Sequence, residues 1–255
     1  MIIDADAHIS PFNASPYDIC VDELLRRMDR ARVDRALTWL RPPYHRDVSA
    51  GNRYVSRAAR DHPDRIIGFG WADPHFGLEA MRDEADRCLD EYGFTGIKLN
   101  GAQNEFTIDD PVLVLPLIEH LAARGAVVAF HVGCDAPDAT HPHRLGRIAG
   151  LFPDTRFLMV HMGGVAFHDL SDPAIDVLRE HPNVTAIGSA VRPVNVLKAI
   201  RAVGPERVCF GSDAPFNLIH VEVAAYEALL ADELTPVERD RVMAGNIASL
   251  LDLPH

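Results

Sequence analysis

Short apolar segments typical of β-strands alternate with helical segments along the whole chain, and this alternation constrains the fold more than any other feature. Most candidate strands are followed by a segment with helical periodicity, such as residues 21–30, whose apolar residues share one face. Regular β–α alternation favours a parallel sheet, and eight units in 255 residues match the usual size of a closed (β/α)₈ TIM barrel. The eight candidate strands are Ile2–Ala5, Ala36–Leu40, Arg65–Trp71, Gly96–Leu99, Val127–His131, Arg156–His161, Val184–Ile187 and Val208–Gly211.

An open, doubly wound α/β sheet is the alternative architecture. Such a sheet usually carries a glycine-rich phosphate loop after its first strand, but residues 6–11 (DAHISP) contain no glycine. Helix start signals agree with the β–α scheme: Asp110 and Asp172 each precede a proline, as N-cap residues do, and Thr235 and Glu238 predict a capping box. No linker or internal repeat divides the sequence, so we expect one α/β barrel domain over residues 1–255.

Composition excludes several classes of function. The 25 Lys and Arg residues against 37 Asp and Glu give a net charge of −12, which argues against nucleic acid or an anionic membrane as partner. No apolar stretch approaches the roughly 18 residues of a membrane span. The N-terminus lacks the basic segment of a signal peptide, and the four scattered cysteines are typical of reduced thiols. We therefore expect a cytoplasmic protein that acts on a small-molecule substrate.

Residue types that bind metals fall at the predicted carboxyl ends of four strands, where active sites of such barrels form. Asp6 and His8 alternate along the first strand, so both side chains can face one point. His131, His161 and Asp213 end three further strands. Two carboxylates and three imidazoles form a nitrogen and oxygen ligand set that suits Zn²⁺ or Mn²⁺. Each residue alone has a structural interpretation, such as a helix N-cap for Asp213 or a turn residue for Asp6. The prediction therefore depends on their coincidence.

This constellation resembles the amidohydrolase superfamily, and more closely its amidohydrolase-2 branch of metal-dependent TIM-barrel hydrolases and decarboxylases. The resemblance covers nearly the whole chain. Each motif alone is weak, but together and in this order they are specific. They are residues 3–8 (IDADAH), 96–99 (GIKL), 131–133 (HVG), 141–145 (HPHRL), 161–164 (HMGG), 181–184 (HPNV), 211–215 (GSDAP) and 245–248 (GNIA).

The resemblance implies a ligand set and roles for its members. It implies that His8, His131 and Asp213 ligate one divalent metal. From the ligand set we expect Zn²⁺, with Mn²⁺ as the alternative. The resemblance also implies that His161 acts beside the metal-bound water as a base or transition-state stabiliser, and that Asp213 shares in proton transfer. Asp6 departs from the family pattern, which more usually has His there and has Glu in some decarboxylases. We expect Asp6 to ligate the metal, either directly or through water, and the alternative is that the shorter side chain leaves the site weaker. A homodimer is also common among such proteins.

Four further residues are predicted to bind substrate. Lys98 lies in the fourth strand as a cation near the site. Its alternatives are a buried ion pair, or the carboxylated lysine that bridges two metals in other branches of the superfamily. Arg192 follows the seventh strand, where it could meet a substrate carboxylate or simply lie on the surface. Arg41 and Trp71 follow the second and third strands and could wall the pocket, although Trp71 could instead pack in the core.

The expected activity is metal-dependent hydrolysis, in which a metal-activated water attacks a small lactone, ester or amide. Its alternative is a metal-dependent nonoxidative decarboxylase of a hydroxyaryl or enol carboxylic acid, because the same ligands can orient such an acid. Decarboxylases of this branch tend to be longer, so the 255-residue length favours hydrolysis. A second alternative is a catalytically inactive barrel that serves as a binding protein, and the departure at Asp6 keeps this alternative open.

Overall fold

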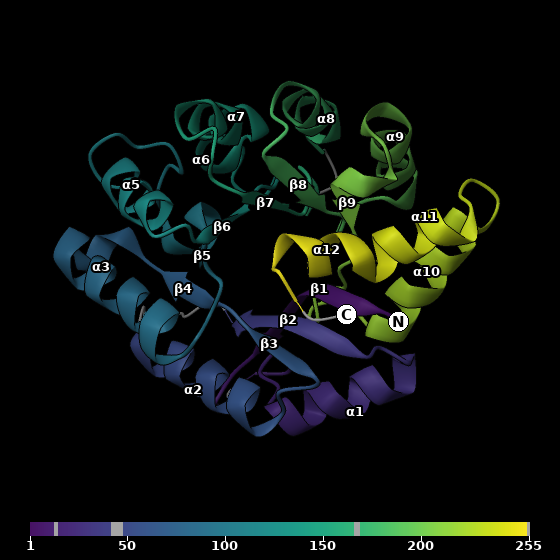
Figure 1. Cartoon of the computed structure of the whole chain (residues 1–255), viewed down its shortest axis with the longest axis horizontal. Coiled ribbons are helices and arrows are strands. Elements are labelled where there is room, and N and C mark those ends of the chain that lie inside the picture. Colours follow the sequence, from purple (N-terminus) through teal and green to yellow (C-terminus); the bar gives the residue numbers. More distant parts are fainter. Residues whose placement is uncertain (13–14, 42–47, 166–168, 254–255) are drawn as a thin grey trace.

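The computed structural model describes residues 1–12, 15–41, 48–165 and 169–253, and its helices lie mostly around a ring of strands (Figure 1). The strands are β1 (Ile3–Ile9), β2 (Arg35–Leu40), β3 (Ile66–Gly68), β4 (Gly70–Ala72), β5 (Gly96–Leu99), β6 (Val127–His131), β7 (Phe157–Val160), β8 (Val184–Ile187) and β9 (Val208–Cys209).

The longer helices follow the strands and cover their outer face. They are α1 (Val21–Ala31), α2 (Val48–Asp61), α3 (Leu78–Asp86), α5 (Leu115–Ala123), α7 (Pro142–Leu151), α8 (Ser171–Glu180), α9 (Pro193–Val203) and α10 (Ile219–Ala231). The shorter helices are α4 (Gly101–Asn104), α6 (Pro137–Thr140), α11 (Pro236–Asp240) and α12 (Asn246–Leu250), with single turns η1 (Pro74–Phe76), η2 (Arg87–Glu91), η3 (Pro205–Arg207) and η4 (Arg241–Gly245). Among the described residues, no helix is long and apolar enough to cross a membrane.

Parallel pairing runs in the order β1-β2-β3 and then β4-β5-β6-β7-β8-β9. The strand predicted at residues 65–71 is therefore two short strands on either side of Phe69. The N–H of Phe69 still donates to the carbonyl of Thr38 in β2 at 3.0 Å, so β3 and β4 occupy one position in the ring. Gly68 and Gly70 flank this break because the side chains of neighbouring elements approach their backbone closely.

The ring closes between β1 and the segment after β9. The N–H of Ala5 donates to the carbonyl of Phe210 at 3.0 Å, and Ala7 forms a parallel bridge with Ala214. The closed ring of parallel strands with outer helices confirms the predicted single-domain TIM barrel.

Most element boundaries agree with the sequence patterns, with three informative differences. The capping box of Thr235 and Glu238 is present at the start of α11. Helix α8 begins at Ser171, so Asp172 lies in its first turn instead of capping it. The side chain of Asp110 accepts two backbone N–H groups in a turn that precedes α5, which begins only at residue 115. Strand β1 continues to residue 9 and is buried throughout, which places Asp6 inside the strand.

Candidate metal centre

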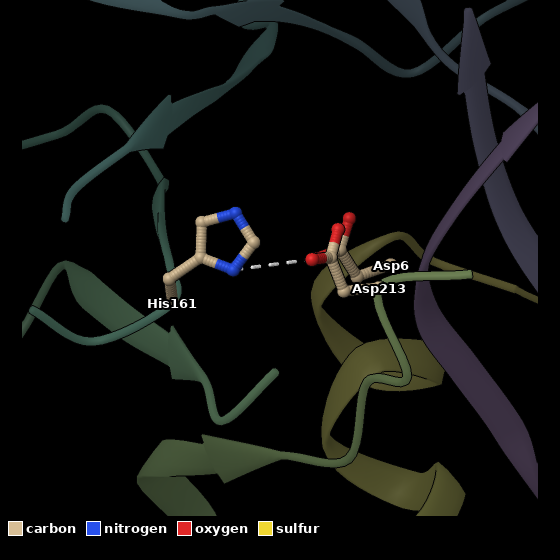
Figure 2. A group of neighbouring side chains, drawn as sticks. All are labelled: Asp6, His161 and Asp213. Carbon is tan, nitrogen blue, oxygen red and sulfur yellow. Dashed lines mark ion pairs between the residues drawn. The ribbon is translucent and has the colours of Figure 1, made fainter. Parts of the chain in front are cut away.

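Two buried carboxylates, Asp6 and Asp213, lie beside His161 in the barrel mouth (Figure 2). On one side, His8 Nε2 lies 3.5 Å from Asp6 Oδ1 and 3.6 Å from Asp213 Oδ1. On the other side, His161 Nδ1 lies 3.7 Å from Asp6 Oδ2. One ligand atom from each of Asp6, His161 and Asp213 lies within 4.8 Å of the others. This grouping of nitrogen and oxygen donors is compact enough to surround one divalent ion.

His161 and Asp213 lie just after strands β7 and β9, and both have a strained backbone conformation. His161 has φ of 71° and Asp213 has φ of 61°, both in the left-handed region. Residues other than glycine rarely adopt this conformation, and it persists only where the surrounding structure holds it. The N–H of Asp213 donates to the carbonyl of Asp6 at 2.9 Å, which fastens the turn to β1. The surrounding structure thus holds these two residues in a strained conformation that directs their side chains into the mouth of the barrel.

Hydrogen bonds decide which nitrogen of His8 meets the carboxylates. Its Nδ1 donates to the carbonyl of Leu40 at 2.9 Å, which leaves Nε2 as the lone-pair nitrogen of the neutral ring. The Trp39 indole N–H points at that Nε2 at 3.2 Å. Burial lowers the pKa of His8, but hydrogen bonding to Asp213 and Asp6 raises it overall. Trp39 therefore favours a lone pair on His8 Nε2, whereas the two carboxylates favour a proton there. A divalent cation bound to Nε2 could take the place of that proton.

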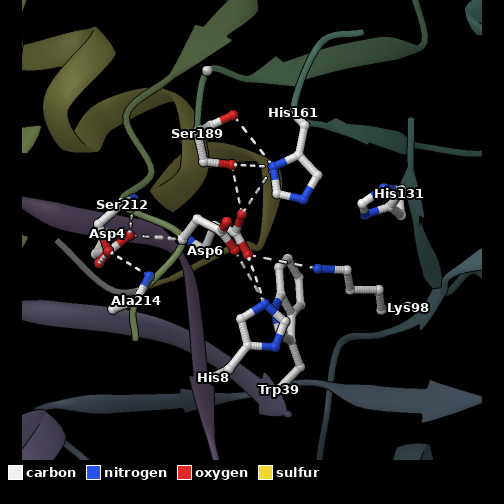
Figure 3. Close-up of polar contacts among 12 residues, drawn as sticks. Asp4, Asp6, His8, Trp39, Lys98, His131, His161, Ser189, Ser212 and Ala214 are labelled. Carbon is white, nitrogen blue, oxygen red and sulfur yellow. Dashed lines mark hydrogen bonds and ion pairs between the residues drawn. The ribbon is translucent and has the colours of Figure 1, made fainter. Parts of the chain in front are cut away.

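The two carboxylate oxygens of Asp6 have different neighbours (Figure 3). Oδ2 accepts a hydrogen bond from the hydroxyl of Ser189 at 2.5 Å. Oδ1 lies 3.5 Å from Lys98 Nζ and has no hydrogen-bond partner in the described part of the chain. Burial alone would raise the pKa of Asp6, but Lys98 and the neighbouring imidazoles hold it well below its usual range. The result is a buried, ionised oxygen that still lacks a strong partner.

Lys98 on β5 brings a positive charge to the same place. Its side chain is fully buried, and Nζ lies 3.7 Å from the centre of the Trp39 ring and 5.4 Å from that of Trp71. Burial lowers the pKa of Lys98, and the charges of Asp6 and Asp213 partly offset this effect. Within the described residues Nζ has no hydrogen-bond partner. Such an ammonium group favours an incoming anion.

His131 ends β6 and is turned toward a loop. Its Nε2 lies 2.9 Å from Asp135 Oδ1. Gly133 leaves space for this pair, because a Cβ at that position would lie 2.6 Å from the same oxygen. The rings of His131 and His161 are 4.6 Å apart between centroids. The pKa of His161 is lowered to about 4, mainly by burial and also by the nearby His131, although Asp213 and Asp6 partly offset this effect. His161 is consequently neutral near pH 7.

The cluster opens into two adjoining cavities. The smaller has a volume of about 100 Å³ and is lined by His8, Lys98, Asn100, Gln103, His131, Asp135, His161, Val165, Asp213 and Phe216. The larger has a volume of about 820 Å³ and shares Val165 and Asp213 with the first. Arg192 and Glu222 are among the residues that line this larger space. Asp213 therefore lies where the two cavities meet.

Most of the predicted site residues come together in the structure. The smaller cavity or its immediate wall contains Asp6, His8, Lys98, His131, His161 and Asp213. The other three predicted substrate-binding residues do not line this cavity within the described ranges. Trp71 is buried, and the centre of its ring lies 5.4 Å from Lys98 Nζ. Arg41 pairs with Asp18 at 2.6 Å, and Arg192 has a half-exposed side chain in the larger cavity.

Sequence analysis missed Asp4, Trp39, Asp135 and Ser189, which hold the predicted residues in place. A signal for Asp4 was present, because it shares the alternation of Asp6 and His8 along β1. Asp135 and Ser189 lie on loops after strands, where sequence spacing does not specify a partner.

The chain matches one family model and is similar to several known proteins. The family model described as Amidohydrolase (Amidohydro_2) matches residues 3–253. The curated γ-resorcylate decarboxylase of Rhodococcus jostii (strain RHA1) is 25% identical, and the match covers 91% of this chain and 87% of that protein. The solved structure of 2,6-dihydroxybenzoate decarboxylase from Rhizobium has a TM-score of 0.79 at 16% identity and 98% coverage of both chains.

A dihydroxybenzoic acid decarboxylase from Polaromonas sp. JS666, solved with manganese and the inhibitor 2-nitroresorcinol, is also similar. It has a TM-score of 0.74 at 19% identity, with 98% of this chain and 96% of that chain covered. These structural likenesses support the barrel fold assigned above.

Proposed function

This chain belongs to the amidohydrolase family, and from that membership we propose that it is a metal-dependent, nonoxidative decarboxylase of a small hydroxyaryl carboxylic acid. The observation that carries the proposal is the match to γ-resorcylate decarboxylase along 91% of the chain. Two decarboxylases of dihydroxybenzoic acids among the solved neighbours agree with it. Sequence analysis preferred hydrolysis, and the comparisons support its alternative better.

The residues present fit one divalent metal. We assign Asp6, His8, His131 and Asp213 as its ligands, and His131 would exchange its contact with Asp135 for the ion. The supporting observation is Asp6 Oδ1, which is buried beside His8 without a hydrogen-bond partner among the described residues. Zn²⁺ and Mn²⁺ both suit this donor set, and a solved neighbour contains manganese. When bound, the ion supplies a positive charge that orients the oxygens of an anionic acid and stabilises charge that develops on them.

Lys98 and His161 are proposed to bind the two polar groups of the substrate. The ammonium of Lys98 faces the cavity beside the Trp39 ring and provides the charge that attracts a carboxylate. His161 is neutral, because burial lowers its pKa to about 4, so it can accept the proton or hydrogen bond of a phenolic hydroxyl. A hydroxyaryl acid offers both groups on one rigid ring.

Asp213 is proposed to deliver the proton. Its side chain is 11% exposed, whereas that of Asp6 is fully buried, so Asp213 is the carboxyl group that a bound ring can touch. Its proton adds to the ring carbon that bears the carboxylate. The bond between that carbon and the carboxylate then breaks, its electron pair returns to the ring, and CO₂ leaves. Asp213 regains a proton from water after the phenol departs.

A product assay tests the proposal. The protein supplied with Mn²⁺ or Zn²⁺ is incubated with a panel of hydroxybenzoic acids and, separately, with lactones and esters. We expect CO₂ and phenol in equal amounts, and a loss of about 10²–10⁴-fold in kcat for Asp213→Asn. Arg201→Gln changes a surface ion pair with Glu233 and serves as the control. Release of acid from a lactone without CO₂ would instead support hydrolysis. Metal binding without turnover of either panel would support the binding-protein alternative.

A further inference from the structure

We propose that Ser189 is a positioning residue that joins Asp6 to His161 and determines which nitrogen of His161 faces the cavity. Ser189 directly follows Gly188 at the end of β8, and its side chain is fully buried. In Figure 3, dashed lines join Ser189 to both the Asp6 carboxylate and the His161 ring.

The contacts of Ser189 are short and involve both its side chain and its backbone. Its hydroxyl donates to Asp6 Oδ2 at 2.5 Å. The same hydroxyl oxygen lies 3.0 Å from His161 Nδ1, and the Ser189 carbonyl oxygen lies 3.2 Å from that nitrogen. Asp6 Oδ2 is 3.7 Å from Nδ1, which is too far for a direct hydrogen bond. Ser189 therefore provides the hydrogen-bonded connection between the two side chains.

The hydrogen bonds of Ser189 determine which nitrogen of the His161 ring carries the proton. A serine hydroxyl has one proton, which is donated to Asp6, so toward His161 its oxygen can only accept. The Ser189 carbonyl also can only accept. Both contacts thus require a proton on Nδ1, and the neutral ring then carries its lone pair on Nε2. Because His161 lines the smaller cavity, that lone pair is the one available to a substrate hydroxyl.

The contact with Ser189 also gives the two carboxylate oxygens of Asp6 different roles. The Ser189 hydroxyl occupies Oδ2, so Oδ1 is the oxygen left toward His8 and Lys98. An aspartate is shorter than the glutamate of some related decarboxylases, and a hydrogen bond that fixes its rotation keeps one oxygen aimed at the cluster. Partners of this kind usually influence metal affinity or activity by about 10–100-fold.

The inference rests on the proposed function only in placing Asp6 and His161 in one site. Its test uses no substrate, so its failure can be distinguished from failure of the decarboxylase assignment. The first measurement is ¹⁵N NMR of the histidine ring nitrogens in the metal-free protein, with the His161 signals identified by their loss in His161→Gln. We expect a protonated Nδ1 and an unprotonated Nε2 near pH 7. A protonated Nε2 with a bare Nδ1 would overturn the proposal.

The second measurement is the affinity for Mn²⁺ alone, from competition with a chelating dye. Ser189→Ala is expected to bind Mn²⁺ about 10–100-fold more weakly than the wild type. Ser189→Thr keeps the hydroxyl and is expected to bind more tightly than Ser189→Ala. Ser171→Ala replaces another buried serine and controls for the loss of a hydroxyl from the interior. Wild-type affinity in Ser189→Ala would overturn the role of the hydroxyl.

Discussion

Lys98 carries a positive charge into a fully buried position, where its nearest neighbours are an aromatic ring and one carboxylate. A buried charge is tolerated when it is paired, and removing one partner leaves the other uncompensated. The pairing with Asp6 is therefore a condition for the stability of the metal-free protein. It also means that a divalent cation entering the cluster meets an existing positive charge nearby.

This arrangement predicts the behaviour of Lys98→Met. The metal-free variant should lose about 3 kcal/mol of unfolding free energy, because Asp6 remains buried without its cation. Mn²⁺ should stabilise the variant more than it stabilises the wild type, because the competing positive charge is gone. Urea unfolding with and without Mn²⁺ measures both effects. Lys198→Met removes an exposed lysine that pairs with Asp172 and should change stability by less than about 1 kcal/mol. Equal stabilisation of Lys98→Met and wild type by Mn²⁺ would contradict this account.

A sequence can assign to the site those residues that lie at or near the carboxyl ends of predicted strands. Asp6, His8 and Asp213 were predicted together because parallel strands of a barrel end on one face. Ser189 was missed because its role depends on how the loop after β8 approaches Asp6 and His161. Asp135 was missed because its role depends on how the loop after β6 folds back onto His131. A sequence specifies which residues lie near the mouth, whereas the identity of each hydrogen-bond partner requires the folded loops.

At the scale of elements, the closure of the barrel depends on a carboxyl group of β1. Asp4 is buried, and its Oδ1 accepts the N–H of Ser212 at 2.8 Å while its Oδ2 accepts the Ser212 hydroxyl at 2.5 Å. These bonds fasten β1 to the segment after β9, directly beside Asp213. Burial raises the pKa of Asp4 to about 7, although the hydrogen bonds from Ser212 lower it.

The raised pKa predicts a pH dependence of stability. An unfolded Asp4 ionises near pH 3.8, whereas the folded carboxyl group stays protonated up to about pH 7. Stability from this group is therefore complete below pH 3.8 and is lost as the pH rises through 7, by roughly 4 kcal/mol in total. Asp4→Asn resembles the protonated form at every pH and should lack this loss. The difference between the urea-unfolding curves of variant and wild type from pH 4 to 8 isolates the effect. Parallel curves would contradict it.

The boundaries of helices and strands were predictable where one local sequence pattern determines them. They were less predictable where packing against other elements determines them. Apolar runs defined β5, β6 and β8 to the residue. The run at residues 65–71 gave no sign of its division at Phe69, because the break depends on side chains from other elements that approach Gly68 and Gly70. Helix α8 begins one residue before its expected cap, at Ser171, which is buried.

At the scale of the whole molecule, chain length does not distinguish hydrolysis from decarboxylation. The 255 residues suggested a hydrolase, yet the chain covers 98% of the Rhizobium decarboxylase structure and 96% of the Polaromonas one. The expected homodimer and cytoplasmic location stay predictions.

The cluster around Asp6 and Asp213 is proposed to be a metal centre, and elemental analysis of the untagged protein measures whether an ion is bound there. We predict about one zinc or manganese ion per chain, lost in Asp213→Ala and kept in Arg192→Ala, whose side chain lies in the larger cavity. Two ions per chain would contradict the single-metal site and point to a carboxylated Lys98. No bound metal, even after supplementation with Zn²⁺ and Mn²⁺, would contradict the proposed metal centre itself.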